Sequence, residues 1–145
     1  MRKFKQGAVL TVAAAAVLAG SVAVSSPAEA ASSPIAACGG GSYHEIDHHN
    51  LGAVATIHLL YNGTTDCVVT WKNPPYAGTT TRTQAFIAKE NSSGVITGYI
   101  YDDKNYAFYA GPVKINAPGT CIDWGGGVPI NGDFTIWTDP FSHCG

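Results

Sequence analysis

Residues 53–71 of this chain, AVATIHLLYNGTTDCVVTW, predict its fold class more directly than any other stretch. Alternate residues of the first part, Ala55, Ile57, Leu59 and Tyr61, are apolar or aromatic, which is typical of a β-strand with one buried face. Asn62-Gly63 then begins a polar loop, and Asn-Gly is a strong signal for a hairpin turn. The β-branched run after Cys67 predicts a second strand. The stretch therefore predicts an antiparallel hairpin.

The rest of the chain shows the same alternation of short strands and turns. We expect further strands over residues 79–89, 95–101, 106–110, 113–116, 121–124 and 134–138. Residues 102–105 are expected to form a turn, and the glycine runs at 39–41 and 125–127 are expected to lie in loops, the second of them extending to residue 133. No segment after residue 30 keeps apolar residues at helical spacing over three turns. About seven or eight short strands predict an all-β fold, an antiparallel sandwich or barrel.

The first thirty residues have the pattern of a secretory signal peptide. Basic residues at positions 2, 3 and 5 precede an apolar stretch over residues 8–24, and Ala28-Glu29-Ala30 provides a small-residue cleavage site. A membrane anchor is the alternative, but serine, glycine and proline end the apolar stretch and no charged stop-transfer run follows. We therefore expect residues 1–30 to be removed and the mature protein to be secreted.

The mature chain is long enough for one domain. Removal of the signal peptide leaves 115 residues, for which we expect a flexible N-terminus over residues 31–37 and a single disulfide-linked β domain over residues 38–145. Five basic and nine acidic residues remain, a net charge of −4 with neutral histidines. A chain without a basic patch is not expected to bind nucleic acid or, after signal cleavage, a membrane.

Four cysteines remain in the mature chain: Cys38, Cys67, Cys121 and Cys144. An even number in a small exported chain predicts two disulfides. A four-cysteine zinc site is the alternative, but its ligands normally come in close pairs, which this sequence lacks. Three pairings are possible. We favour Cys38–Cys67 with Cys121–Cys144, because neighbouring strands in all-β folds usually pair in sequence order.

Residues 44–48, HEIDH, match the zinc pattern of metalloproteases, in which two histidines one helical turn apart bind zinc and the glutamate acts as general base. Here the segment lies between glycines and a strand, and in an extended strand His44 and His48 would lie about 13 Å apart. The third ligand of the longer pattern is absent, since Val54 occupies its position, and the only methionine is Met1. The segment is therefore expected to be a solvated polar strand.

Two alternatives for this segment stay open. His44, His48 and His49 are candidates for weak metal binding, and a small secreted metalloprotease that uses His44, Glu45 and His48 is a minor alternative function. No catalytic residue and no cofactor are expected.

Tyrosines gather on two neighbouring strands around one turn. Tyr99, Tyr101 and Tyr106 are the candidate binding residues, because an aromatic platform on a rigid sheet suits sugar rings or a protein partner. Packing of these side chains in the core is the alternative, since aromatic residues also favour strands.

Two segments of the second half carry a family resemblance, residues 109–113 (YAGPV) and 117–126 (APGTCIDWGG). Together with Cys38-Gly39, residues 67–70 and the closing His-Cys-Gly, they resemble the spore-associated protein A family of filamentous, spore-forming bacteria. The resemblance implies a small exported protein found with spores and aerial filaments, without an established catalytic activity. It carries over the cysteine framework and, as structural residues, Asp123, Trp124, Gly125 and Gly126.

We therefore expect a secreted, non-catalytic protein with a structural or adhesive role at the spore or cell surface. Its expected partners are the spore or cell-wall surface, a polysaccharide or a secreted protein. The alternative is an extracellular binding module or hydrolase inhibitor that uses the tyrosine platform. Trp124 is expected to pack in the core with its N–H on a backbone carbonyl, and the glycines after it are expected to allow a sharp turn.

Overall fold

A computed structural model describes residues 31–145, and the predicted signal peptide over residues 1–30 lies outside the described residues. Within residues 31–145 the chain forms one short helix and eight strands, which confirms the expected all-β class. In chain order they are α1 (Pro34–Cys38), β1 (His44–Leu51), β2 (Ala55–Tyr61), β3 (Thr65–Lys72), β4 (Thr81–Glu90), β5 (Ile96–Tyr106), β6 (Tyr109–Asn116), β7 (Cys121–Ile130) and β8 (Asp133–Ser142). In this described part, no helix is long and apolar enough to cross a membrane.

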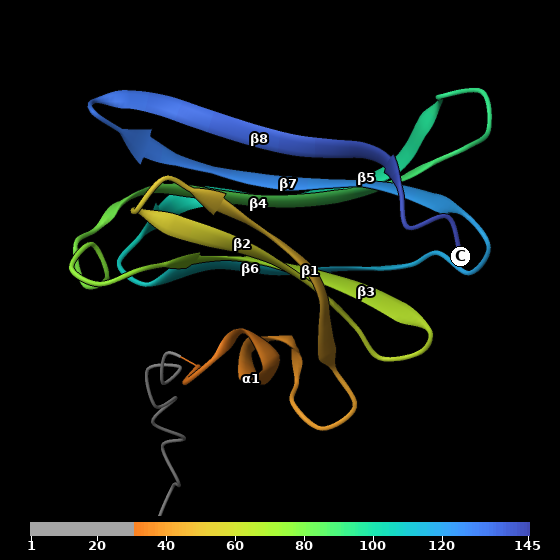
Figure 1. Cartoon of the computed structure of the whole chain (residues 1–145), viewed down its shortest axis with the longest axis horizontal. Helices are drawn as coiled ribbons and strands as arrows, with labels where there is room; N and C mark the ends of the chain where they lie inside the picture. Colours follow the sequence, from red (N-terminus) through yellow and green to blue (C-terminus); the bar gives the residue numbers. More distant parts are fainter. Residues whose placement is uncertain (1–30) are drawn as a thin grey trace, which may run out of the picture.

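The strands form two antiparallel sheets that lie one above the other as a sandwich (Figure 1). The first sheet has the order β1-β2-β3-β6, and the second has the order β5-β4-β7-β8. The hairpin predicted from residues 53–71 is β2–β3, whose register pairs Tyr61 with Asp66. Each sheet turns an apolar face toward the other, so stacking removes these two faces from water together.

The main core fills the space between the two sheets. Its fully buried large side chains include Ile57, Leu59, Val68, Ile87, Ile122, Trp124 and Val128. Alternation along β2 shows how the sequence produces this core, since Ile57 and Leu59 point inward while Thr56 and His58 do not.

A smaller cluster covers the other side of the first sheet, beneath α1. It contains Cys38, Leu60, Cys67 and Val69, all fully buried. We expected residues 31–37 to be a flexible end, but α1 begins within them. Ser33 caps this helix by accepting a hydrogen bond from the backbone N–H of Ala36 at 3.1 Å.

The two disulfides are Cys38–Cys67 and Cys121–Cys144, which confirms the favoured pairing. The first attaches α1 to β3, and the second attaches the end of the chain to the start of β7.

The expected loop over residues 125–133 is wrong, because β7 continues through the three glycines to Ile130. These glycines are required by close packing rather than by a turn. A Cβ on Gly126 would lie 2.1 Å from Thr70 Oγ1 and 2.6 Å from the carbonyl oxygen of Gln84. On Gly125, it would lie 2.2 Å from the carbonyl oxygen of Trp137. The glycines therefore let neighbouring groups approach a central strand directly.

The expected turn over residues 102–105 is also wrong, since β5 continues to Tyr106. The two strands predicted over residues 106–110 and 113–116 are instead one strand, β6, which begins at Tyr109. Neighbouring strands supply the hydrogen bonds that the two aspartates would otherwise seek in a turn. Asp103 accepts hydrogen bonds from Arg82 Nε at 2.9 Å and Nη2 at 2.7 Å. Asp102 accepts one from the backbone N–H of Gly111 at 2.9 Å.

Candidate functional site

An exposed aromatic surface lies on the outer side of the second sheet. We call Phe86, Tyr99, Tyr101 and Ile136 the tyrosine face, because strand pairing places them on one side of β5, β4 and β8. Tyr99 and Tyr101 are 49% and 63% exposed, and their ring centroids lie 5.8 Å apart. Phe86 is buried beside Tyr99, at a centroid distance of 5.7 Å. Partial burial and then the charge of Asp123 raise the pKa of Tyr99.

Tyr106, the third predicted platform residue, does not belong to the tyrosine face. It packs against the core between the sheets, and its hydroxyl donates a hydrogen bond of 2.6 Å to Asp102 Oδ1. Burial first, and the bond to Asp102 second, raise the pKa of Tyr106 to about 12. The sequence places Tyr106 at an odd distance from its two neighbours, so the period of the strand alone turns it to the opposite face.

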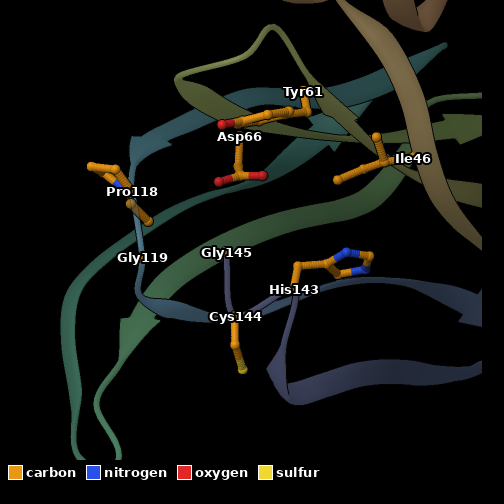
Figure 2. Close-up of a pocket in the computed structure, with 9 residues that line it drawn as sticks. Ile46, Tyr61, Asp66, Pro118, Gly119, His143, Cys144 and Gly145 are labelled. Atoms are coloured by element: carbon orange, nitrogen blue, oxygen red, sulfur yellow. The ribbon is translucent and has the colours of Figure 1, made fainter.

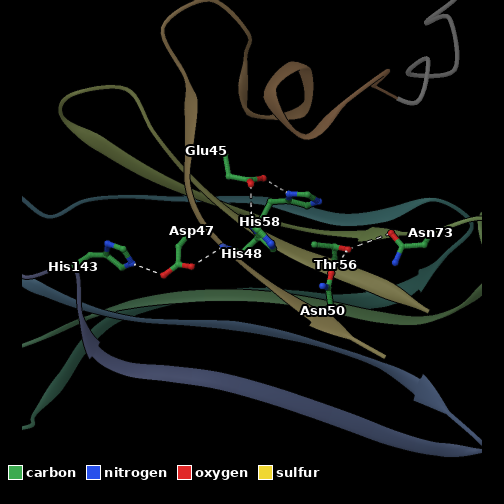
Figure 3. Close-up of polar contacts among 8 residues, drawn as sticks. All are labelled: Glu45, Asp47, His48, Asn50, Thr56, His58, Asn73 and His143. Atoms are coloured by element: carbon green, nitrogen blue, oxygen red, sulfur yellow. Dashed lines mark hydrogen bonds and ion pairs between the residues drawn. The ribbon is translucent and has the colours of Figure 1, made fainter. Parts of the chain in front are cut away.

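The metalloprotease-like segment lies in β1 and is extended, as expected (Figure 3). A shift of register between Glu45 and Asp47 turns Glu45 and His48 toward the same side of the strand. Glu45 Oε1 lies 3.1 Å from His48 Nδ1, and Glu45 Oε2 lies 2.5 Å from His58 Nδ1. His44 instead meets the ring of Tyr61 edge-on. Glu45 thus contacts His48, which belongs to the pattern, and His58, which does not.

His49, the third weak metal candidate, faces the second sheet. Its ring stacks on Trp137 at a centroid distance of 4.0 Å. Among residues 31–145, one group of three side chains could hold a metal ion: Asp47, Asp139 and His143, whose ligand atoms lie within 4.8 Å of one another. His143 Nε2 is 3.0 Å from Asp47 Oδ2. None of the histidines proposed from the sequence belongs to this group.

A pocket of 320 Å³ opens next to this group (Figure 2). It is lined by Ile46 and Tyr61 of the first sheet, by Asp66 of β3, and by residues 117–119 and 143–145. The β2–β3 hairpin, the turn before β7 and the end of the chain therefore meet around one cavity.

Asp66 is the buried acidic residue of this pocket, with an exposed fraction of 7%. Burial raises the pKa of its carboxyl to about 6, although the nearby His143 lowers it in part. In turn, burial and then the charge of Asp66 raise the pKa of Tyr43. No local pattern in the sequence predicted this pocket. The available signal was that both polar residues stand next to a cysteine, Asp66 before Cys67 and His143 before Cys144.

The segment around Trp124 occupies a structural position. Trp124 is fully buried, and its Nε1–H donates a hydrogen bond of 3.1 Å to Ser142 Oγ, not to the backbone carbonyl that we expected. Asp123 is buried on the opposite side of β7 and accepts a hydrogen bond from the hydroxyl of Thr138. Gly125 and Gly126 continue the same strand.

No protein-family model matches this chain, and no solved structure matches it. Among curated proteins, it is similar to spore-associated protein A of Streptomyces coelicolor, with 36% identity over 110 residues. The match covers 74% of this chain, and the chain spans 64% of the length of that relative. This similarity covers most of the described domain and confirms the resemblance seen in the sequence. The chain is thus similar to spore-associated protein A over 110 residues, which supports the family resemblance of its sequence motifs.

Proposed function

We propose that the protein is a secreted, non-catalytic component of the spore or cell exterior, and that the tyrosine face attaches it there. The observation that carries this proposal is the pair of exposed tyrosines, Tyr99 and Tyr101, on β5, the edge strand that pairs with β4. Each ring offers a large contact area at a small loss of side-chain entropy, because only two side-chain torsions must be ordered.

The surroundings of the tyrosine face support a role in attachment. Phe86 packs beside Tyr99 and limits its movement, while Ile136 adds an exposed apolar side chain on the same side of the sheet. Flat aromatic rings beside apolar groups match the faces of sugar rings and the apolar surfaces of other proteins. A wall or spore surface presents such groups repeatedly, so many copies of a weak contact suffice for attachment.

Secretion and the absence of catalysis have separate support. Two disulfides form most readily in an oxidising compartment, in agreement with the predicted signal peptide. Glu45, the general base of the metalloprotease hypothesis, contacts His48 and His58 on the surface of β1. His44 and His48 lie in an extended strand, too far apart along it for one zinc ion, and the register shift between them turns them to opposite sides.

Co-sedimentation with purified spores and cell-wall material tests the proposal. The Tyr99→Ser/Tyr101→Ser double variant should lose at least about tenfold in apparent affinity, because two aromatic contacts are removed. Tyr76→Ser is the matched control, since Tyr76 is an exposed tyrosine in the β3–β4 loop. Both variants should keep the melting temperature of the parent protein, because the altered side chains are exposed.

Equal sedimentation of the double variant and the parent protein would refute attachment through the tyrosine face. The alternative role is that of a hydrolase inhibitor. It would be identified if the parent protein does not sediment with spores or walls but inhibits a secreted hydrolase, and if the double variant no longer inhibits that enzyme.

A further inference from the structure

The pocket beside Asp66 is a second candidate site, on a different part of the molecule from the tyrosine face. Its walls come from segments far apart in the chain, among them β1, β3 and the end of the chain. Part of the wall is apolar and is formed by Ile46, Ala117 and Pro118. The polar side chains of the lining are Asp66, His143 and the phenol of Tyr61. The volume of 320 Å³ corresponds to a ligand of a few to about a dozen non-hydrogen atoms.

The Asp66 carboxyl is buried but points into this cavity. Figure 2 shows the carboxyl group directed away from Tyr61 and toward the space between Gly145 and His143. Burial and the charge of His143 are the influences on its ionisation, and no hydrogen bond to its carboxyl oxygens is found within residues 31–145. Because Asp66 lines the cavity, a ligand inside it can donate hydrogen bonds to the carboxyl oxygens.

The groups around Asp66 leave it short of positive charge. Tyr43 and Tyr61 contribute phenols, which carry no positive charge, and His143 is the basic side chain that faces Asp66. His143 Nε2 is already within 3.0 Å of Asp47 Oδ2, and Asp139 lies within the same group. A positive charge on His143 therefore also interacts with two other carboxylates, which weakens its effect on Asp66.

We propose that this pocket binds a small ligand that carries a protonated primary amine, with the ammonium group held by the Asp66 carboxylate and the apolar part against Ile46 and Pro118. An ammonium group supplies both the missing charge and up to three N–H donors. Amino sugars and the side chain of lysine share this chemistry, and both occur as free molecules and in polymers. The proposal does not depend on the tyrosine face.

Binding to the purified, disulfide-bonded protein can be measured by NMR titration with glucosamine and with n-butylamine. At pH 7 at least one of the two should bind at a single site, with a Kd on the order of 1 mM for molecules of this size. Binding of glucosamine alone would indicate that the ligand is an amino sugar, and binding of n-butylamine alone would indicate an aliphatic amine. The neutral analogues N-acetylglucosamine and 1-butanol should bind at least about tenfold more weakly, because they lack the charge.

Two variants locate the binding group. Asp66→Asn should weaken amine binding at least about tenfold, because it removes the charge and keeps the shape of the side chain. Asp133→Asn, at the exposed start of β8, removes the same charge elsewhere and should leave the affinity unchanged. In the parent protein, carbon NMR of the Asp66 carboxyl should show its pKa falling when the amine is added, which tests the contact even without a variant.

The pH dependence has a defined sign. Because the Asp66 pKa is about 6, the carboxylate is mostly ionised at pH 7 and mostly protonated at pH 5, so the affinity should fall roughly tenfold over this range. Because the charge of His143 lowers the Asp66 pKa, His143→Gln should move this fall in affinity to higher pH without removing it. Failure of both amines to bind, equal binding of the neutral analogues, or an unchanged affinity in Asp66→Asn would each overturn the proposal.

Discussion

At the scale of single residues, Trp124 shows how much of the core depends on one side chain. Its indole is fully buried between the sheets, meets the ring of Trp137 edge-on at 5.1 Å, and donates a hydrogen bond to Ser142. Tyr101 lies at the other extreme, because most of its ring faces water. The same class of side chain thus stabilises the fold at one position and is available for contacts at the other.

Trp124→Ala should lower the free energy of unfolding by about 3–5 kcal/mol, because it removes the largest core side chain and leaves a cavity. Trp124→Phe is the control, since it keeps an aromatic ring and loses the hydrogen bond to Ser142 together with part of the volume, so its loss should be smaller. Denaturant unfolding with intact disulfides measures both variants. An unchanged unfolding midpoint for Trp124→Ala would contradict the structural role of this residue.

At the scale of elements, β7 is the strand on which the second sheet depends. It pairs with β4 on one side and β8 on the other, and its glycines lie opposite Phe86, Thr70 and Phe134. A strand with three consecutive glycines is intrinsically weak, since glycine loses the most backbone entropy on folding. Its two neighbouring strands, and the close contacts that only glycine permits, compensate for this weakness.

Gly126→Ala should therefore lower the free energy of unfolding by about 3 kcal/mol, near the upper end for overpacked sites, because Thr70 and the backbone of Gln84 occupy the space that a Cβ needs. Gly132→Ala provides the comparison, since nothing lies within 4 Å of the added Cβ and only its backbone φ of +92° opposes the change. It should lower the stability by only roughly 1 kcal/mol. Equal losses in thermal unfolding would contradict the close-packing explanation.

At the scale of the whole molecule, the two disulfides hold opposite parts of the sandwich. Cys38–Cys67 keeps α1 over Leu60 and Val69, whereas Cys121–Cys144 keeps the end of the chain beside the pocket. Loss of either bridge should destabilise the domain, but only loss of the second should disturb the pocket directly.

The Cys38→Ser/Cys67→Ser and Cys121→Ser/Cys144→Ser double variants test this division. Each should lower the free energy of unfolding by about 2–5 kcal/mol, as removal of a native bridge does in small exported domains. Amine binding should weaken only in the second variant, at conditions where both remain folded. Equal weakening in both variants would show that the pocket depends on the sandwich as a whole.

Local patterns in the sequence were sufficient for several features of this protein. Period-2 alternation and the Asn-Gly turn predicted the β2–β3 hairpin, and the number of short strands predicted an all-β fold. The cysteine pairing followed from sequence order. Tyr99 and Tyr101 were placed together because residues two apart in a strand share a face. Apart from the cysteine pairing, whose partners lie 29 and 23 residues apart, these features depend on residues close in the chain, which a short window of sequence contains.

The tertiary structure alone determined the remaining features. Glycines 125–127 lie in a strand because of what packs against them, and Asp102 and Asp103 lie in one because other strands provide their hydrogen-bond partners. The pocket depends on the stacking of two sheets, on the irregular register of β1 and on a disulfide that holds the chain end. Asp66 and His143 are far apart in the sequence, and no local pattern records that they face one cavity. Periodicity encodes which side of a strand a residue occupies, but which distant residues it meets depends on how the sheets pack.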